Sequence, residues 1–370
     1  MLGQASISGI GQSLQVNCQI GDVEYAEELA QVTKIGDETY ATMAIVALDC
    51  LISGLPDYEL MAIGHRVVHG GLQFDGPVLA NTETINQLTQ LIPLAPIHQE
   101  HNLDIVKAAQ HMWPDTPQIL SFDTAFHRTQ PRIASFYALP QSLTERGIVR
   151  FGFHGLSYTY ISTSLEDIFP DHAHNRVVVA HLGAGASLCA LQDGHSVATS
   201  MGLTTLDGVP MATRCGELDP GVVLHLIQEQ GMTAEQVSDL LYHKSGLLGL
   251  SGLSGDVQVL LASKLPGAAE ALSIYAYRIA REIGSMAVAL GGIDALVFTG
   301  GVGEHAESIR ANICQYLTWL GLELNGEANL KSLSQISHST SVISVAVITA
   351  NEELIIAQEA MKVSETLDNF

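Results

Sequence analysis

The chain has 370 residues, more than one hydrophobic core usually organises, so two domains are expected. It carries 16 Lys and Arg against 39 Asp and Glu, and the net charge of −23 excludes nucleic acids and anionic membrane surfaces as expected partners, because both are bound by basic patches. The 5 cysteines include no Cys-x-x-Cys pair, which favours a reducing, cytoplasmic location.

The first chemically informative segment is Ile63–Gly71, a β-branched run that carries two histidines and an arginine. Strand alternation places His65 and His69 on one face and Arg66 and Val68 on the other. A His-x-x-x-His spacing serves zinc on a helix with a glutamate between the histidines, and this segment lacks both. A metal site is therefore not favoured here.

Two short apolar runs further along the chain end in polar residues, at Pro96–His98 and at Ser121–His127. Site residues of α/β sheets commonly lie where strands end. For either motif alone, a hydrogen-bonded turn is the simpler interpretation.

The most informative stretch combines Arg150–Gly155 with Val178–Ser187. It places a cation and two imidazoles beside a strand that enters a glycine-rich turn, whose backbone N–H groups can bind phosphate. One such turn is usually only a tight turn, because glycine is the default residue for positive φ. A second strand, Ala295–Thr299, also enters a glycine turn, so the pattern indicates a cleft that handles phosphoryl groups.

The second half of the chain alternates between strand and helix patterns. Expected elements are an antiparallel meander of strands 177–181, 187–191 and 195–201 with an Asp-Gly turn, a helix 234–244 behind a Thr233 capping box, a helix 268–290, a strand 295–299, a helix through 309–317, a strand 341–348 and a helix N-capped by Asn351. This order predicts a mixed α/β protein. The most apolar window, 286–298, is too short and too polar to span a membrane.

Eight motifs occur in an order that resembles the acetate kinase family, which also contains propionate and butyrate kinases. They are GHRVVHGG (64–71), FDTAFH (122–127), RFGFHG (150–155), AHLGAGAS (180–187), TRCGELDPG (213–221), SGLLGLSG (245–252), FTGGVGE (298–304) and NEEL (351–354). The ordered set covers nearly the whole chain and is far more specific than any one motif.

The resemblance implies an α/β fold of two actin-like (ribonuclease H-like) domains, as in the acetate and sugar kinase, heat-shock protein and actin superfamily. The N-terminal domain would span 1–122, and the C-terminal domain, with the nucleotide site and dimer interface, 123–353. The helix 354–370 would pack back on the N-terminal domain. A cytoplasmic homodimer is implied, which exchanges a phosphoryl group, with Mg²⁺, between ATP and a short carboxylic acid such as acetate.

The same resemblance assigns roles to residues of the reaction. Arg66 and Arg214 would hold the carboxylate and the transferring phosphoryl group, since guanidinium forks suit both. His154 would donate to the equatorial phosphoryl oxygens, and Asp123 would orient either Arg66 or a substrate proton. The small pocket for the acyl group would comprise Val68, Ile97 and Phe153.

Nucleotide and metal contacts are implied in four segments. His181 would contact phosphate together with the turn Leu182, Gly183, Ala184 and Gly185. Further nucleotide contacts would come from Asp256, Val257, Gln258, Gly300, Gly301, Val302, Gly303 and Glu304. Glu352 would bind Mg²⁺.

Some positions depart from the family's motifs. Ala184 stands for an Asn, Tyr158 for the His of Gly-Thr-Ser-His, Gln258 for an Arg, and Thr205 for a Pro beside the acyl pocket. These departures concern substrate preference and nucleotide affinity rather than reaction class. The family's opening strands, with an Asn for magnesium and a Lys for ATP, have no counterpart here, so a chain starting at Met1 is expected to have little or no kinase activity, although its C-terminal half is expected to fold.

Two alternatives to a carboxylate kinase remain. The run Gly301–Ala306 fits the Gly-x-Gly-x-x-Gly/Ala fingerprint of NAD-dependent oxidoreductases, although that fingerprint belongs in an opening βαβ unit. The other alternative is a catalytically impaired remnant of the same family that dimerises through its C-terminal half.

Overall fold

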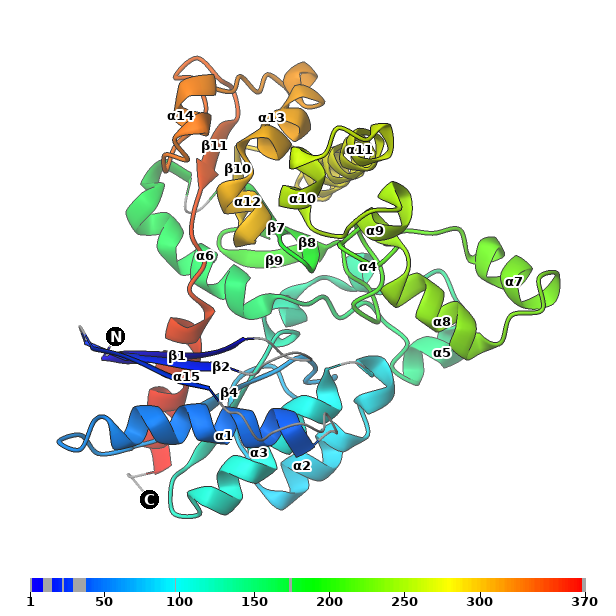
Figure 1. Cartoon of the computed structure of the whole chain (residues 1–370). Helices are drawn as coiled ribbons and strands as arrows, with labels where there is room; N and C mark the ends of the chain where they lie inside the picture. The colour runs from blue at the N-terminus through cyan, green and yellow to red at the C-terminus, as the bar shows by residue number, and fades with distance from the viewer. Residues whose placement is uncertain are drawn as a thin grey trace. The chain divides into compact units, whose positions relative to one another are not determined.

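The computed structural model describes residues 2–8, 15–21, 23–28, 38–96, 98–172 and 175–367 (Figure 1). The chain forms two units, each with its own core. Unit 1 comprises Met1–Asp123 and Glu353–Phe370, and unit 2 comprises Thr124–Glu352. Predicted Ile97 lies outside the described residues.

Unit 1 contains two three-stranded sheets. In the first, β1 (Gly3–Ser8), β2 (Gln15–Ile20) and β3 (Val23–Glu28) are antiparallel in the order β1-β2-β3. The second has the order β4-β6-β5, with β4 (Ile63–Val67) parallel to β6 (Gln118–Phe122) and β5 (Val78–Leu79) antiparallel to β6. Along β4 buried and exposed residues alternate, with His65 buried and Arg66 exposed, as expected for a strand with one covered face.

Helices cover these strands. They are α1 (Glu38–Ser53), α2 (Thr82–Thr89), α3 (Gln99–Met112) and α15 (Glu352–Leu367), with the short turn η1 (Ile92–Leu94). Helix α15 lies against β4 so closely that a Cβ added to Gly64 would stand 2.5 Å from Ile356 Cγ2. A glycine in β4 is thus what allows the C-terminal helix to pack on this sheet.

Unit 2 is built on a five-stranded sheet of order β11-β10-β7-β8-β9. Strands β7 (Arg176–Leu182), β8 (Ala186–Gln192) and β9 (His195–Thr199) form the predicted antiparallel meander. Asp193 (φ 52°) and Gly194 (φ 75°) make its turn, with both residues in the left-handed region, as a type I′ hairpin requires. Strands β10 (Ala295–Thr299) and β11 (Ser344–Val347) are parallel to β7, so the mixed α/β prediction is confirmed.

The helices of unit 2 are α4 (Arg132–Ser135), α5 (Gln141–Glu145), α6 (Gly155–Ile168), α7 (Pro220–Gln228), α8 (Ala234–His243), α9 (Gly246–Ser251), α10 (Val257–Ala262), α11 (Pro266–Leu290), α12 (Gly300–His305), α13 (Glu307–Gln315) and α14 (Gly326–Leu330), with short turns at Ala125–Thr129, Pro170–His172 and Thr318–Leu320. Thr233 and Gln236 form the predicted capping box. A core cluster joins α6 to the sheet through Tyr158, Ile161, Leu165, Val177, Val179, Cys189, Leu191 and Val297.

The second glycine segment differs from the sequence prediction. Its residues do not form an open turn before a helix, because α12 already begins at Gly300. In this segment only Gly300 has a positive φ, of 76°, and a Cβ there would meet Leu182 O at 2.8 Å. One glycine therefore makes the corner, and the others continue as helix. Within the described ranges, no helix is both long and apolar enough to cross a bilayer.

Candidate active site

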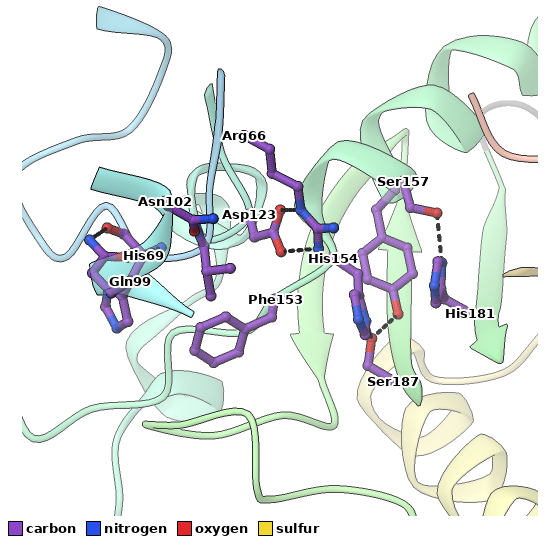
Figure 2. A network of polar contacts seen from close by, with 12 residues as sticks. Arg66, His69, Gln99, Asn102, Asp123, Phe153, His154, Ser157, His181 and Ser187 are labelled. Carbon is purple, nitrogen blue, oxygen red and sulfur yellow. Dashed lines mark hydrogen bonds and ion pairs between the residues drawn. The ribbon is translucent and has the colours of Figure 1, made fainter. Parts of the chain in front are cut away.

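In unit 1, the two parallel strands β4 and β6 bring an arginine and an aspartate together at their carboxyl ends (Figure 2). Arg66 Nε donates to Asp123 Oδ1 at 2.9 Å and Arg66 Nη2 to Asp123 Oδ2 at 2.7 Å, a bidentate fork. The Asp123 side chain is 2% exposed and that of Arg66 42%. A buried carboxylate therefore orients a guanidinium that still reaches solvent, which favours the first of the two roles expected for Asp123.

The loop after β4 is fastened to α3 through side-chain amides. Asn102 Oδ1 accepts from Val68 N at 3.1 Å, Gln99 Oε1 accepts from His69 N at 3.1 Å, and Gln99 Nε2 donates to His69 O at 3.0 Å (Figure 2). His69 Nδ1 accepts from Gly71 N at 2.9 Å. Burial lowers the pKa of His69 to about 4, so its ring is neutral at pH 7. Val68, predicted for the acyl pocket, is buried in this hydrogen-bonded loop.

In unit 2, the imidazoles of His154 and His181 stack on one another. Their ring centroids lie 4.4 Å apart with planes 18° from parallel. His181 on β7 and Ser187 on β8 are register partners, so their side chains share one face of the sheet. His154 Nδ1 lies 2.8 Å from Ser187 Oγ, and His181 Nδ1 lies 2.8 Å from Ser157 Oγ (Figure 2). Both rings are thereby held by neutral hydroxyl groups.

Arg214 and His154 meet at the first glycine turn. A Cβ added to Gly185 would lie 3.3 Å from His154 Nε2 and 3.7 Å from Arg214 Nη2, so both nitrogens converge on the space beside this glycine. Arg214 Nη1 donates to Thr205 O at 3.0 Å. Burial lowers the pKa of the Arg214 guanidinium, yet arginine stays charged in proteins. This convergence gives the positive charge and N–H groups of Arg214 and a ring nitrogen of His154 beside a glycine turn, which suits an anion.

A cavity of about 510 Å³ opens beside this turn within unit 2. Its walls come from Gly183, Ala184, Ala212, Gly255, Asp256, Val257, Gln258, Leu261, Gly301, Val302, His305, Ala306 and Glu307. Seven of these are predicted nucleotide residues: Gly183, Ala184, Asp256, Val257, Gln258, Gly301 and Val302. Asp256 Oδ1 caps α10 by accepting from Gln258 N at 2.7 Å, which fixes this wall.

Leu261 and His305 were missed by the sequence reasoning. A helical signal could have found Leu261, since it lies four residues after Val257 on α10 and therefore on the same face. Conversely, Glu304 is predicted to contact nucleotide but does not line the cavity. Its Oε1 accepts from Gly300 N at 2.9 Å and Ala350 N at 3.3 Å, so the carboxylate fastens the glycine corner to the loop before α15.

Arg150, the cation of the Arg150–Gly155 segment, holds the scaffold together. Its Nη1 donates to Ser200 O and Met201 O, each at 2.8 Å, and forms an ion pair of 3.2 Å with Asp207. The guanidinium therefore ties the segment before α6 to the end of the meander. Phe153, predicted for the acyl pocket, is 1% exposed.

Glu352, predicted to bind magnesium, is half-buried at the start of α15. Among the residues that the structure describes, no group of three or more His, Cys, Asp or Glu could hold a metal ion. Mg²⁺ bound with nucleotide phosphates needs no such cage, because one or two carboxylates, the phosphates and water complete its shell. A single carboxylate at Glu352 fits that kind of site.

The sequence matches the Acetokinase family over residues 5–358. The chain belongs to this family. It is 53% identical over 313 residues to an acetate kinase of Rhodopseudomonas palustris, covering 84% of this chain and 79% of that one. A propionate kinase structure from Francisella tularensis has 35% identity and a TM-score of 0.90 over 98% of this chain and 93% of its own.

An acetate kinase structure from Porphyromonas gingivalis has 33% identity and a TM-score of 0.86 over the same shares of the two chains, 98% and 93%. The predicted fold class is thus confirmed. Family membership makes the chain a carboxylate kinase that uses ATP, and it decides against the NAD-dependent oxidoreductase. The run that fits the dinucleotide fingerprint lies in α12, far from the start of the chain.

Proposed function

We propose that this chain transfers a phosphoryl group reversibly between ATP and acetate, with propionate as a second substrate. The observation that supports this most directly is the approach of His154 Nε2 and Arg214 Nη2 to Gly185, beside the 510 Å³ cavity of unit 2. An anion at the glycine turn would receive two charge-assisted or polar N–H bonds while a nucleotide occupies the cavity.

The proposed chemistry needs no nucleophilic side chain. A carboxylate oxygen of the acid attacks the γ-phosphorus of ATP, the bond to the β-γ bridging oxygen breaks, and ADP leaves with that electron pair. The transition state spreads negative charge over three equatorial oxygens. We assign donation to those oxygens to His154 and Arg214, and binding of the acid's carboxylate to Arg66, which Asp123 orients.

We assign nucleotide binding to the walls of the cavity, to His181 at the glycine turn and, by resemblance, to Leu182, Gly185, Gly300, Gly303 and Glu304. Mg²⁺, when bound, neutralises charge on the β- and γ-phosphates, and Glu352 would hold it. The pocket for the acyl group is assigned to Val68, Ile97 and Phe153. Cytoplasmic location is proposed on the unpaired state of all five cysteines.

The resemblance implies a small apolar pocket for the acyl group, from which we propose a limited acyl selectivity. One methylene in an apolar pocket is worth only about 1–3 kcal/mol, so acetate and propionate should differ in kcat/KM by no more than about two orders of magnitude. Competition between acetate, propionate and butyrate measures this. A strong preference for butyrate would contradict the proposed pocket.

The decisive experiment is an assay of ATP-dependent acyl phosphate formation, trapped with hydroxylamine. Wild-type protein should form acetyl hydroxamate, and His154→Ala should lose most of the rate. Arg132→Ala is the matched surface control, since Arg132 is exposed and its guanidinium lies over Phe136, 4.7 Å from the ring centroid. Absence of activity in the wild type, with ATP still bound, would support the impaired remnant instead.

We also propose a homodimer, for which α7 provides support. None of its residues is buried, and three of its apolar side chains, Val222, Leu224 and Ile227, are exposed. An apolar helix with no buried residue is typical of an association surface. Leu224→Glu should shift the molar mass measured by light scattering from dimer to monomer, whereas an unchanged mass would rule out α7 as the contact.

A further inference from the structure

A chain of hydrogen bonds runs from the protein interior to His154. The Tyr158 hydroxyl on α6 lies 2.6 Å from Ser187 Oγ on β8. Ser187 Oγ in turn lies 2.8 Å from His154 Nδ1 (Figure 2). Tyr158 and Ser187 are both 0% exposed. Bulk solvent therefore does not reach these two hydroxyl groups, and the direction of each bond follows from which atoms have hydrogens to donate.

The direction starts at Tyr158. Its ring packs at an angle of 72° to His127 and stacks on Phe126, so its hydroxyl is enclosed. Burial raises the pKa of Tyr158 well above its ordinary value, so the phenol keeps its proton. Among the described residues, Ser187 Oγ is the one hydrogen-bond partner of that hydroxyl. Tyr158 must therefore donate, and Ser187 must accept.

The Ser187 hydroxyl then has one hydrogen of its own to place. Across the described part of the chain, its side-chain partners are Tyr158 Oη and His154 Nδ1. Because Tyr158 already donates, Ser187 donates to His154 Nδ1, which must carry a lone pair. A neutral imidazole with a lone pair on Nδ1 carries its proton on Nε2.

We propose that Tyr158 and Ser187 are positioning residues that hold His154 as the Nε2–H tautomer, so that it presents a hydrogen-bond donor at the Gly185 turn. Nε2 is the nitrogen that lies 3.3 Å from the position of a Cβ on Gly185. The opposite tautomer would leave a buried hydroxyl hydrogen without an acceptor, which is disfavoured. The use of that donor toward a phosphoryl oxygen rests on the proposed function.

The residue type at position 158 supplies a test within the family pattern. The resembled motif has His where this chain has Tyr158, and an imidazole N–H can donate to Ser187 as a phenol can. Phenylalanine keeps the ring but has no donor. Tyr158→His should therefore preserve the Nε2–H tautomer of His154, and Tyr158→Phe should allow both tautomers of His154 to be populated. Tyr160→Phe, on the same helix, removes a hydroxyl that makes no hydrogen bond to Ser187 and is the matched control.

The first readout is independent of activity. Selective ¹⁵N labelling of histidine, with the His154 signals assigned by comparison with His154→Asn, distinguishes a protonated ring nitrogen from one with a lone pair. We expect protonated Nε2 and unprotonated Nδ1 in the wild type, Tyr158→His and Tyr160→Phe. In Tyr158→Phe and Ser187→Ala, the ¹⁵N chemical shifts of the two ring nitrogens of His154 should move toward the averaged values of a mixture of the two tautomers. A proton on Nδ1 in the wild type, or an unchanged tautomer in both latter variants, would overturn the proposal.

The second readout is kinetic. Tyr158→Phe should lower kcat about fivefold to tenfold with little change in either KM, because only the orientation of a donor is lost. A merely structural loss would instead lower the fraction of active protein, which active-site titration reports. If His154→Ala is fully active while the wild-type tautomer is as stated, the catalytic role of His154 fails and the tautomer assignment stands.

Discussion

The site residues of the two units are held by opposite means. At the ends of β4 and β6, a buried carboxylate fixes the full positive charge of Arg66. At the ends of β7 and β8, the imidazoles of His154 and His181 are fixed by hydroxyl groups that carry no charge. A carboxylate partner would repel a phosphoryl oxygen at the glycine turn, whereas a hydroxyl aims the ring without adding negative charge. The charge of each hydrogen-bond partner therefore matches the expected ligand. A carboxylate orients the arginine expected to bind the acid, and uncharged hydroxyl groups orient the imidazoles beside the expected phosphoryl group.

The largest effects should come from the two arginines. Arg66→Ala and Arg214→Ala should each lower kcat at least about a hundredfold, since an arginine that stabilises phosphoryl transfer contributes about 10³–10⁵ in rate. Lysine should rescue neither, because it lacks the planar fork. Steady-state kinetics at saturating ATP measures this. Near-normal turnover of Arg214→Ala would show that Arg214 does not stabilise the transition state.

The two arginine variants should differ in stability. Arg66→Ala leaves the carboxylate of Asp123 buried and without this partner, whereas Arg214→Ala removes the donor from a neutral group, the carbonyl of Thr205. Thermal unfolding should therefore occur at a lower temperature for Arg66→Ala. Equal unfolding temperatures would show that the two arginines are held by equally weak contacts.

Acid should weaken the unit 1 region through His69. Burial lowers the pKa of this ring from its ordinary 6.5 to about 4. Between these values the unfolded chain binds a proton that the folded chain does not, so stability is complete above pH 6.5 and falls as pH drops toward 4. From pH 7 to pH 5 the loss should be about 2 kcal/mol. Urea unfolding measures it, and His69→Gln should show a smaller pH dependence than the wild type.

The packing of α15 on β4 should limit substitution at Gly64. A Cβ there would stand 2.5 Å from Ile356 Cγ2 and 3.2 Å from Ile356 O, so Gly64→Ala should destabilise unit 1 by about 2 kcal/mol. Gly76→Ala is the matched control, because its Cβ would meet no atom within 4 Å. Similar urea midpoints for the two variants would show that α15 moves away at little cost.

Asp123→Asn should have the smallest effect among these predictions. The amide keeps the shape of the carboxylate but can accept only one bond from the Arg66 fork. We expect about a tenfold loss in kcat/KM for acetate, with KM for ATP unchanged, corresponding to one charge-assisted bond. Unchanged kcat/KM would mean that substrate alone orients Arg66.

Local sequence signals were sufficient for most of unit 2. The meander, the Thr233 capping box and strand Ala295–Thr299 depend on residues close together in the chain, such as the Asp193–Gly194 turn. The motifs likewise identified the glycine turn. The contacts of Arg150 were not predictable, because the carbonyls that it binds lie some 50 residues later and no local pattern marks them.

The Tyr158–Ser187–His154 chain was also beyond the sequence. It depends on the register of β8 against β7 and on the placement of α6 over that sheet, which are set by packing rather than by local propensity. From the sequence, Tyr158 was visible only as a departure from a motif. The structure shows that Tyr158 forms a hydrogen bond with Ser187, so the residue at this position is part of the network around His154.

His154 enters α6 with φ 59°, a backbone shape that costs a side-chain-bearing residue free energy and that glycine adopts without penalty. The backbone conformation at position 154 thus favours glycine, and the chain nevertheless has histidine there. Directed evolution of this enzyme for heat tolerance, without a screen for turnover, is therefore expected to select glycine at this position, which would give a more stable protein without the imidazole that we propose to act in catalysis.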